Sequence, residues 1–139
     1  MDRANEDRIR DSFNRQALLK TLGASLGAVR EGHAEIVAPI LDLAKQQQGF
    51  GHAGLAFSIG DSAAGYAALT LLELDKEVVT SEIKINLLAP AMGERLIARG
   101  RVIRPGRRLL VVASDVYAER DGQEIHIAML TGTMVPVPV

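Results

Sequence analysis

Hydrophobic residues near the start of the chain recur at near-helical spacing. Ile9, Phe13, Leu19 and Leu22 follow this spacing, and charged residues fill the gaps between them. Such a pattern is typical of a helix that buries one stripe and exposes the rest. We therefore predict a surface helix over residues 2–22.

The longest apolar segment, residues 53–74, consists mainly of small residues. Its three glycines each cost a helix about 1 kcal/mol relative to alanine, a loss that close packing against a sheet can offset. The segment is long enough to raise the question of a membrane span, but Asp61 lies in its middle. A buried central helix over residues 53–74 is the better interpretation, and no membrane partner is expected.

Strand-like segments rich in Val, Ile, Leu and Thr occupy most of the remaining chain. They are His33–Ile40, Val78–Leu88, Arg95–Arg104, Leu109–Glu119 and Glu124–Val135. One strand, a long helix and four further antiparallel strands form an α+β order. The simplest packing wraps an antiparallel sheet around the central helix, which is the hotdog fold, here with an extra N-terminal helix. We expect a single domain over residues 1–139.

Composition narrows the possible functions. The chain has 139 residues, no cysteine and a formal net charge of −1. The lack of cysteine excludes disulfides, cysteine nucleophiles and thiolate metal sites. The charge argues against a nucleic-acid partner. The N-terminus lacks the apolar region of a signal peptide, so we expect a cytoplasmic protein.

The start of the central helix is a candidate site for a polarised carbonyl oxygen. The first amides of a helix have no partner within the helix, and the helix dipole favours negative charge there. The backbone N–H of Gly54 can therefore receive a developing oxyanion, because glycine lets a substrate approach closely. His52 stands beside this amide and can orient the loop or the substrate, and the alternative is a residue that only caps the helix or belongs to the loop.

Asp61 is unusual because a carboxylate in an apolar helix carries a desolvation cost. Its pKa is expected to be displaced upward. Asp61 can attack a thioester as a nucleophile or deprotonate water as a general base, and the sequence leaves both roles open. The alternative is a structural acid that pairs with an Arg or Lys.

Spacing along the helix suggests that two copies of the chain build the site. Gly54 and Asp61 are seven residues apart, about 10 Å along a helix axis. Both cannot contact one carbonyl within a single chain. If both act on the same thioester, Asp61 belongs to a second copy, and the active site lies at a dimer interface.

The residues around this helix start resemble the signature of PaaI-type hotdog thioesterases. The family pattern has an amide residue, a Gly, then His-Gly-Gly, with an acid nine positions after the His. His52, Ala53 and Gly54 stand at His-Gly-Gly, and Asp61 stands at the acid. Ala53 departs from the pattern by a methyl group. The resemblance covers nearly the whole chain after the first helix, and residues 60–68 and 83–93 are specific matches within it.

This resemblance implies hydrolysis of an acyl-CoA thioester without a metal or redox cofactor. It implies that Gln46, six residues before the His, positions the water, with Gln47 and Gln48 as alternatives. It also implies that Thr80 supports the acid, with Ser81 adjacent to it. The acid and the His-Gly pair come from different subunits in such enzymes.

Basic residues form a candidate site for CoA phosphates. Arginine suits phosphate because its donors form a fork. The basic candidates are Lys84 on a neighbouring strand and Arg101, Arg104, Arg107 and Arg108 around the Pro105-Gly106 turn. Gly106 of this turn is included in the candidate site. The alternative is a solvated hairpin tip. The family uses this region for the nucleotide.

Two other functions remain open on the same fold: a hydratase or dehydratase of enoyl-CoA, and a non-catalytic acyl-CoA-binding module. The expected assembly is a homodimer or, because sheet edges are exposed, a homotetramer as a dimer of dimers. The identity of the acyl group depends on packing between subunits, which hydrophobic periodicity does not describe.

Overall fold

Antiparallel strands form one six-stranded sheet in the order β1-β2-β4-β5-β6-β3. The computed structural model describes all of residues 1–139. Its strands are β1 (Ser25–Arg30), β2 (His33–Pro39), β3 (Lys76–Leu87), β4 (Arg95–Pro105), β5 (Leu110–Arg120) and β6 (Gln123–Pro138). Five of these strands match predicted segments within a few residues.

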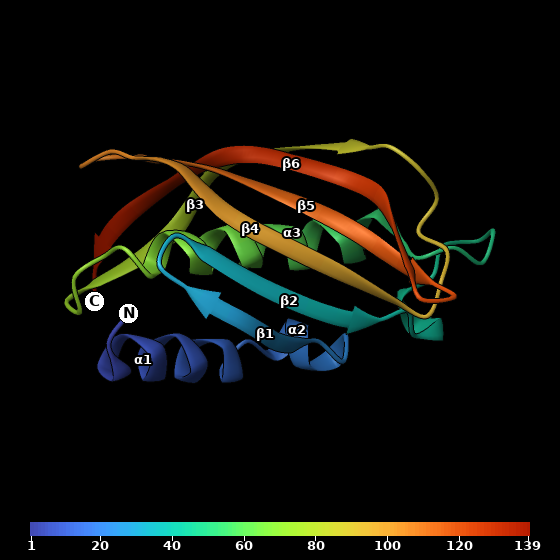
Figure 1. The fold of residues 1–139 in the computed structure, drawn as a ribbon, viewed down its shortest axis with the longest axis horizontal. Coiled ribbons are helices and arrows are strands. Elements are labelled where there is room, and N and C mark those ends of the chain that lie inside the picture. The colour runs from blue at the N-terminus through green and yellow to red at the C-terminus, as the bar shows by residue number, and fades with distance from the viewer.

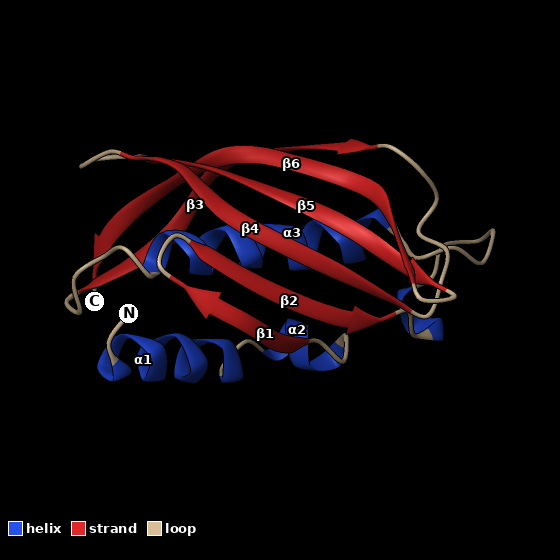
Figure 2. Ribbon diagram, viewed as in Figure 1, coloured by secondary structure: helices blue, strands red, loops and turns tan.

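The sheet curves around one long helix, α3 (Ala53–Leu69), so the predicted hotdog fold is confirmed (Figure 1, Figure 2). Eleven residues of α3 are buried. Small residues allow close contact with the sheet: a Cβ built on Gly100 of β4 would lie 2.3 Å from the carbonyl oxygen of Ala63. Buried Ser114 of β5 donates a hydrogen bond to the carbonyl of Gly60 over 2.7 Å. None of the helices combines the length and hydrophobicity that a membrane crossing requires.

The prediction of one continuous N-terminal helix is wrong. The segment forms α1 (Arg3–Asn14) and α2 (Ala17–Thr21), and Gln16 between them has an extended backbone. Phe13 and Leu19 are both buried, although six residues of a straight helix turn them well away from each other. The break at Gln16 lets both side chains enter the core. In Figure 1 α1 lies beside β1.

The central helix begins at Ala53 as predicted, but it ends at Leu69 rather than Leu74. Thr70 follows as its C-cap, and the Thr70 hydroxyl donates to the carbonyl of Ala67 over 2.6 Å. The same hydroxyl accepts a hydrogen bond from the N–H of Gly32, 2.7 Å away. Contacts with segments distant in the sequence therefore set the end of the helix.

Arg8 of α1 completes this helix end. Its guanidinium donates hydrogen bonds to the carbonyls of Leu69, Leu72, Glu73 and Lys76, at 2.7–3.2 Å. Burial lowers the pKa of Arg8, and nearby carboxylates oppose the shift. A cation on the free carbonyls at a helix C-terminus is favourable. Arg8 thus fixes α1 on the end of α3.

Arg8→Ala is expected to lower the free energy of unfolding by about 2–4 kcal/mol, because several partly buried carbonyls lose a charged donor. Arg10→Ala on the same helix is the matched control. Arg10 forms only an exposed pair with Glu6 at 3.5 Å, and such pairs contribute up to about 1 kcal/mol. Urea unfolding of both variants measures the difference, and equal losses would contradict this role of Arg8.

Strand β1 is absent from the sequence prediction. Its residues are only partly buried, and its register with β2 is interrupted between Leu26 and Val29. The side chain of Glu35 packs against Gly27, so that a Cβ on Gly27 would lie 2.7 Å from the Glu35 carboxylate. An irregular edge strand with a central glycine has no clear alternation, which explains the omission.

Candidate functional site

Asp61 lies in the middle of α3 with its carboxylate half-buried. The hydroxyl of Thr80 on β3 donates a hydrogen bond to Asp61 Oδ1 over 2.7 Å. Burial raises the pKa of Asp61, and the Thr80 hydrogen bond partly opposes the increase. The sequence-based expectation of an upward shift agrees with this environment.

Asp61 takes part in none of the ion pairs of the structure. The alternative of a structural acid paired with an Arg or Lys is therefore not seen. Its carboxylate faces a cavity of about 230 Å³ whose wall includes Thr80, Tyr66 and Met134. An unpaired acid in a cleft is a candidate general base or nucleophile.

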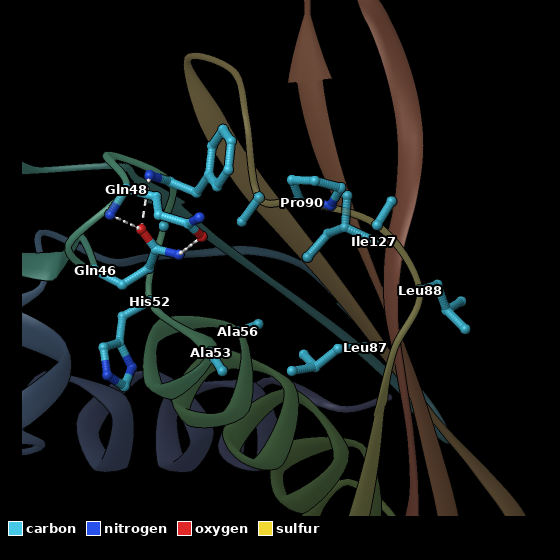
Figure 3. A pocket seen from close by; sticks show the side chains of 13 residues that line it. Gln46, Gln48, His52, Ala53, Ala56, Leu87, Leu88, Pro90 and Ile127 are labelled. Atoms are coloured by element: carbon cyan, nitrogen blue, oxygen red, sulfur yellow. Dashed lines mark hydrogen bonds between the residues drawn. The ribbon is translucent and has the colours of Figure 1, made fainter.

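The start of α3 forms a second, larger cavity of about 480 Å³, shown in Figure 3. Its wall combines the Gln46 loop, the first turn of α3 and the chain after β3, including Leu87 and Leu88. Most of its lining is apolar, and the polar groups gather at the Gln46 loop (Figure 3). This combination is common in ligand-binding pockets.

His52 caps α3 and accepts a hydrogen bond from the Gly54 amide, which the sequence analysis assigned to the substrate carbonyl. The Gly54 N–H donates to His52 Nδ1 over 2.7 Å. The imidazole proton therefore resides on Nε2 in this arrangement. The Gly54 amide becomes available to a carbonyl oxygen only when the imidazole turns away. Ala53 N–H, the first amide of the helix, has no acceptor within the chain.

Gln46 organises the loop before α3. Its Oε1 accepts hydrogen bonds from the N–H groups of Gln48 (2.5 Å) and Phe50 (3.3 Å), drawn as dashed lines in Figure 3. Its Nε2 donates to Gln48 Oε1 over 3.2 Å. Since two backbone donors already use the oxygen, the second hydrogen of Nε2 is what Gln46 can offer to a ligand. The Gln47 side chain is exposed and lies outside this cavity.

The two cavities lie at opposite ends of β3. Val78 and Thr80 contribute to the Asp61 cavity, whereas Leu87 contributes to the cavity at the helix start. The two cavities share no lining residue. One chain alone therefore does not bring Asp61 and Gly54 together, as their spacing along the helix predicts.

The predicted basic residues fall into three environments. Arg104, Arg107 and Arg108 are exposed around the β4–β5 connection and form no ion pair, whereas Arg101 is bound to Asp115 at 2.5 Å. Lys84 is exposed in the middle of β3, between the inward-facing Ile83 and Ile85, so it lies on the sheet face opposite α3.

The β4–β5 connection approaches the Asp61 end of the sheet. Pro105 pairs with Leu110, Leu110 with Met134, and Met134 with Thr80. Gly106 makes the tight connection possible, because a Cβ there would lie 2.5 Å from the Leu109 carbonyl oxygen.

Comparison with known proteins identifies the family. The family model of the thioesterase superfamily matches residues 48–125, which include the end of the loop before α3, α3 itself and Thr80. The chain belongs to the thioesterase superfamily. It is therefore a hydrolase of thioesters, and the resemblance seen in its sequence is confirmed for the superfamily and the fold.

Relatives of this thioesterase align with nearly its full length. A crystal structure of a thioesterase family protein from Silicibacter pomeroyi has 42% sequence identity and a TM-score of 0.94, covering 97% of this chain and 99% of that one. A Saccharolobus solfataricus protein named as a candidate esterase is 29% identical over 91% of this chain and 82% of its own length. The Escherichia coli PaaI protein shares the fold at 21% identity and a TM-score of 0.85, with coverages of 96% and 93%.

Several polar residues around Asp61 in this thioesterase were missed by the sequence analysis. Ser12, Gln16, Ser62 and Tyr66 line its cavity. Ser62 is adjacent to Asp61 in the sequence, and Tyr66 lies four residues after Ser62 on the same helix face, which is a usable signal. No local pattern connects Ser12 and Gln16 with α3. No group of three or more His, Asp or Glu side chains is arranged to hold a metal ion.

Proposed function

We propose that this thioesterase hydrolyses an acyl-CoA to the free acid and CoA, at a site built by two copies of the chain. The observation that carries the proposal is Asp61, a half-buried acid without an ion pair, held by Thr80 in a cavity. The chemistry requires water, an acid and amide donors, so the proposal includes no cofactor.

The ionised Asp61 carboxylate begins the reaction. As a general base it removes a proton from water while the water oxygen bonds to the thioester carbon. The carbon–sulfur bond then breaks, and the CoA thiolate takes the proton from Asp61. As a nucleophile, Asp61 would instead bond to the thioester carbon as the carbon–sulfur bond breaks and the CoA thiolate leaves. Water then hydrolyses the resulting acyl anhydride, which frees the acid and restores Asp61, and the thiolate takes up a proton released from the water. Both routes require Asp61 to be deprotonated at the start.

The free edge of β3 supports a two-chain site. β3 pairs only with β6, so its other edge has unpaired backbone groups. An antiparallel pairing of two β3 edges about a two-fold axis near the middle of the strand would bring the Thr80 end of one chain beside the Leu87 end of the other. The Asp61 cavity of each protomer would then adjoin the helix-start cavity of its partner. A dimer of dimers is compatible with this pairing.

In the proposed site, the helix-start amides receive the thioester carbonyl oxygen. The substrate oxygen displaces His52 Nδ1 from the Gly54 N–H, and the unpartnered Ala53 N–H adds a second donor. Preorganised amides at a helix N-terminus stabilise developing negative charge. His52 thus keeps the donor capped until a substrate arrives.

The exposed cations Arg104, Arg107 and Arg108 are proposed to bind the CoA phosphates. They belong to the connection that approaches the Asp61 end of the sheet and carry no competing carboxylate. Gly106 keeps that connection tight. Lys84 lies on the opposite sheet face, where it can contact only a nucleotide that extends around the edge of β3.

Gln46→Glu is expected to lower kcat by about tenfold, because it keeps the two backbone acceptor bonds of the loop but removes the Nε2 donor. Gln46→Ala, which removes both, is expected to reduce kcat further and to lower the melting temperature. Steady-state kinetics with thermal unfolding separates these effects. A Gln46→Glu variant with unchanged kcat would restrict Gln46 to a structural role.

Release of free thiol from a panel of acyl-CoAs tests the proposed function. Turnover with at least one short-chain, medium-chain or aromatic acyl-CoA is expected. A hydratase or dehydratase would instead change the absorbance of an enoyl-CoA without releasing thiol, and a binding module would retain acyl-CoA unchanged. Either of these results in place of thiol release would contradict the proposal.

A further inference from the structure

The N-terminal segment forms one wall of the Asp61 cavity. Ser12 lies in the last turn of α1, and Gln16 lies at the break between α1 and α2. Both line the cavity together with Asp61, across from Thr80. The break that separates the predicted helix into two parts therefore has a chemical consequence, because it directs Gln16 toward α3.

A polar network covers this wall. Gln16 Nε2 donates to the Tyr66 hydroxyl over 2.8 Å and lies 3.4 Å from Ser62 Oγ. Ser12 Oγ lies 3.1 Å from the same Tyr66 hydroxyl. Because Gln16 donates through Nε2, its Oε1 has no donor within the chain. The cavity thus contains both an available acceptor and hydroxyl groups that can donate or accept.

The position of this wall is fixed independently of the network. Arg8 binds carbonyls at the C-terminus of α3, and Asn5 Nδ2 donates to the Thr70 carbonyl over 2.8 Å. Ile9 and Phe13 are buried beneath α1. Ser12 and Gln16 therefore stand on a rigid support, which is what selective recognition of a substrate group requires.

We propose that Gln16 and Ser12 recognise the acyl group and select short acyl chains that carry a hydroxyl group. The inference rests on the proposed acyl-CoA hydrolysis, since the thioester carbon must lie beside Asp61 in the same cavity. A volume of about 230 Å³ accommodates an acyl group of a few carbon atoms beside Asp61. A hydroxyl on the acyl group donates to Gln16 Oε1, whereas a plain alkyl chain leaves this acceptor unpaired.

The test compares 3-hydroxybutyryl-CoA with butyryl-CoA, two substrates that differ by one hydroxyl. The wild-type protein is expected to hydrolyse the hydroxyacyl substrate with the higher kcat/KM. In Gln16→Leu, the ratio of the two kcat/KM values is expected to fall at least about fivefold, mainly through the hydroxyacyl substrate. Ser12→Ala, a smaller change, is expected to lower the ratio in the same direction.

Gln123→Leu is the matched control, because Gln123 is an exposed glutamine at the β5–β6 hairpin, outside both cavities. Its ratio is expected to equal that of the wild type. A wild-type ratio of one or less would overturn the inference. The inference would also be overturned if Gln16→Leu and Ser12→Ala lost activity on 3-hydroxybutyryl-CoA and butyryl-CoA in equal proportion, because this pattern indicates a purely structural role. A wild-type protein that releases thiol from no acyl-CoA would instead contradict the proposed function itself.

Discussion

Asp61→Asn is expected to lower the rate of thioester hydrolysis by about 10²–10⁴-fold, the usual contribution of a general acid or base. The substitution keeps the shape of the side chain and an oxygen that can accept the Thr80 hydrogen bond. It removes the charge that accepts a proton or attacks the thioester. Thiol release from the best acyl-CoA of the panel measures the loss, and retained turnover would remove Asp61 from the mechanism.

The pH dependence of the wild type follows from the same residue. Burial raises the pKa of Asp61 above the usual range of an aspartate. Since the reaction requires the ionised form, kcat/KM is expected to fall as the pH decreases through this raised pKa. The residual rate of Asp61→Asn is expected to lack this acid limb.

The Asp61→Asn substitution is expected to lower the activity of the protein without lowering the stability of its fold at neutral pH. An acid whose folded-state pKa is raised stabilises the fold below its unfolded-state pKa, and this contribution is lost as the pH rises through the folded-state pKa. At neutral pH the ionised Asp61 therefore destabilises the protein, and Asn removes this cost. The melting temperature of Asp61→Asn is expected to equal or exceed that of the wild type at neutral pH, with the advantage declining in acid. A large drop at neutral pH would show that Asp61 is structural.

Hydrophobic patterning predicted the elements that have a regular face. The small residues after Ala53 indicated a slim buried helix, and Gly100 shows why, because its backbone contacts that of Ala63. Patterning did not predict where α3 ends, since Thr70 and Arg8 end it through partners far along the chain. It did not predict β1 because the glycine and irregular register of this strand leave no alternation.

The residues of the candidate site likewise include some that the sequence predicted and some that it did not. Asp61 was predicted as a candidate because a carboxylate in an apolar helix is conspicuous in a single sequence. A capping role for His52 was one of the alternatives that the sequence left open, although spacing alone does not show that its imidazole accepts the Gly54 N–H. Gln16 and Ser12 were missed because 46 and 54 residues separate them from their partners Ser62 and Tyr66. Only the docking of α1 brings them to the acid.

Two inactive variants are expected to restore activity when their chains are combined. Asp61→Asn removes the acid from one face of the proposed site. Gly54→Val disables the other face: a Cβ at this exposed glycine would lie 3.0 Å from His52 Nδ1, so a branched side chain covers the amide. In a mixed dimer, one site receives both substitutions and the other receives neither, provided that each site combines Asp61 of one chain with the helix start of its partner.

Subunit exchange between these two variants tests the two-chain site most directly. Thiol release measures the activity, and mass spectrometry counts the mixed dimers. Random mixing is expected to recover about a quarter of the wild-type activity, because half of the dimers are mixed and each contains one intact site. Activity that remains at the level of the separate variants, despite abundant mixed dimers, would show that the acid and the helix start do not meet across an interface.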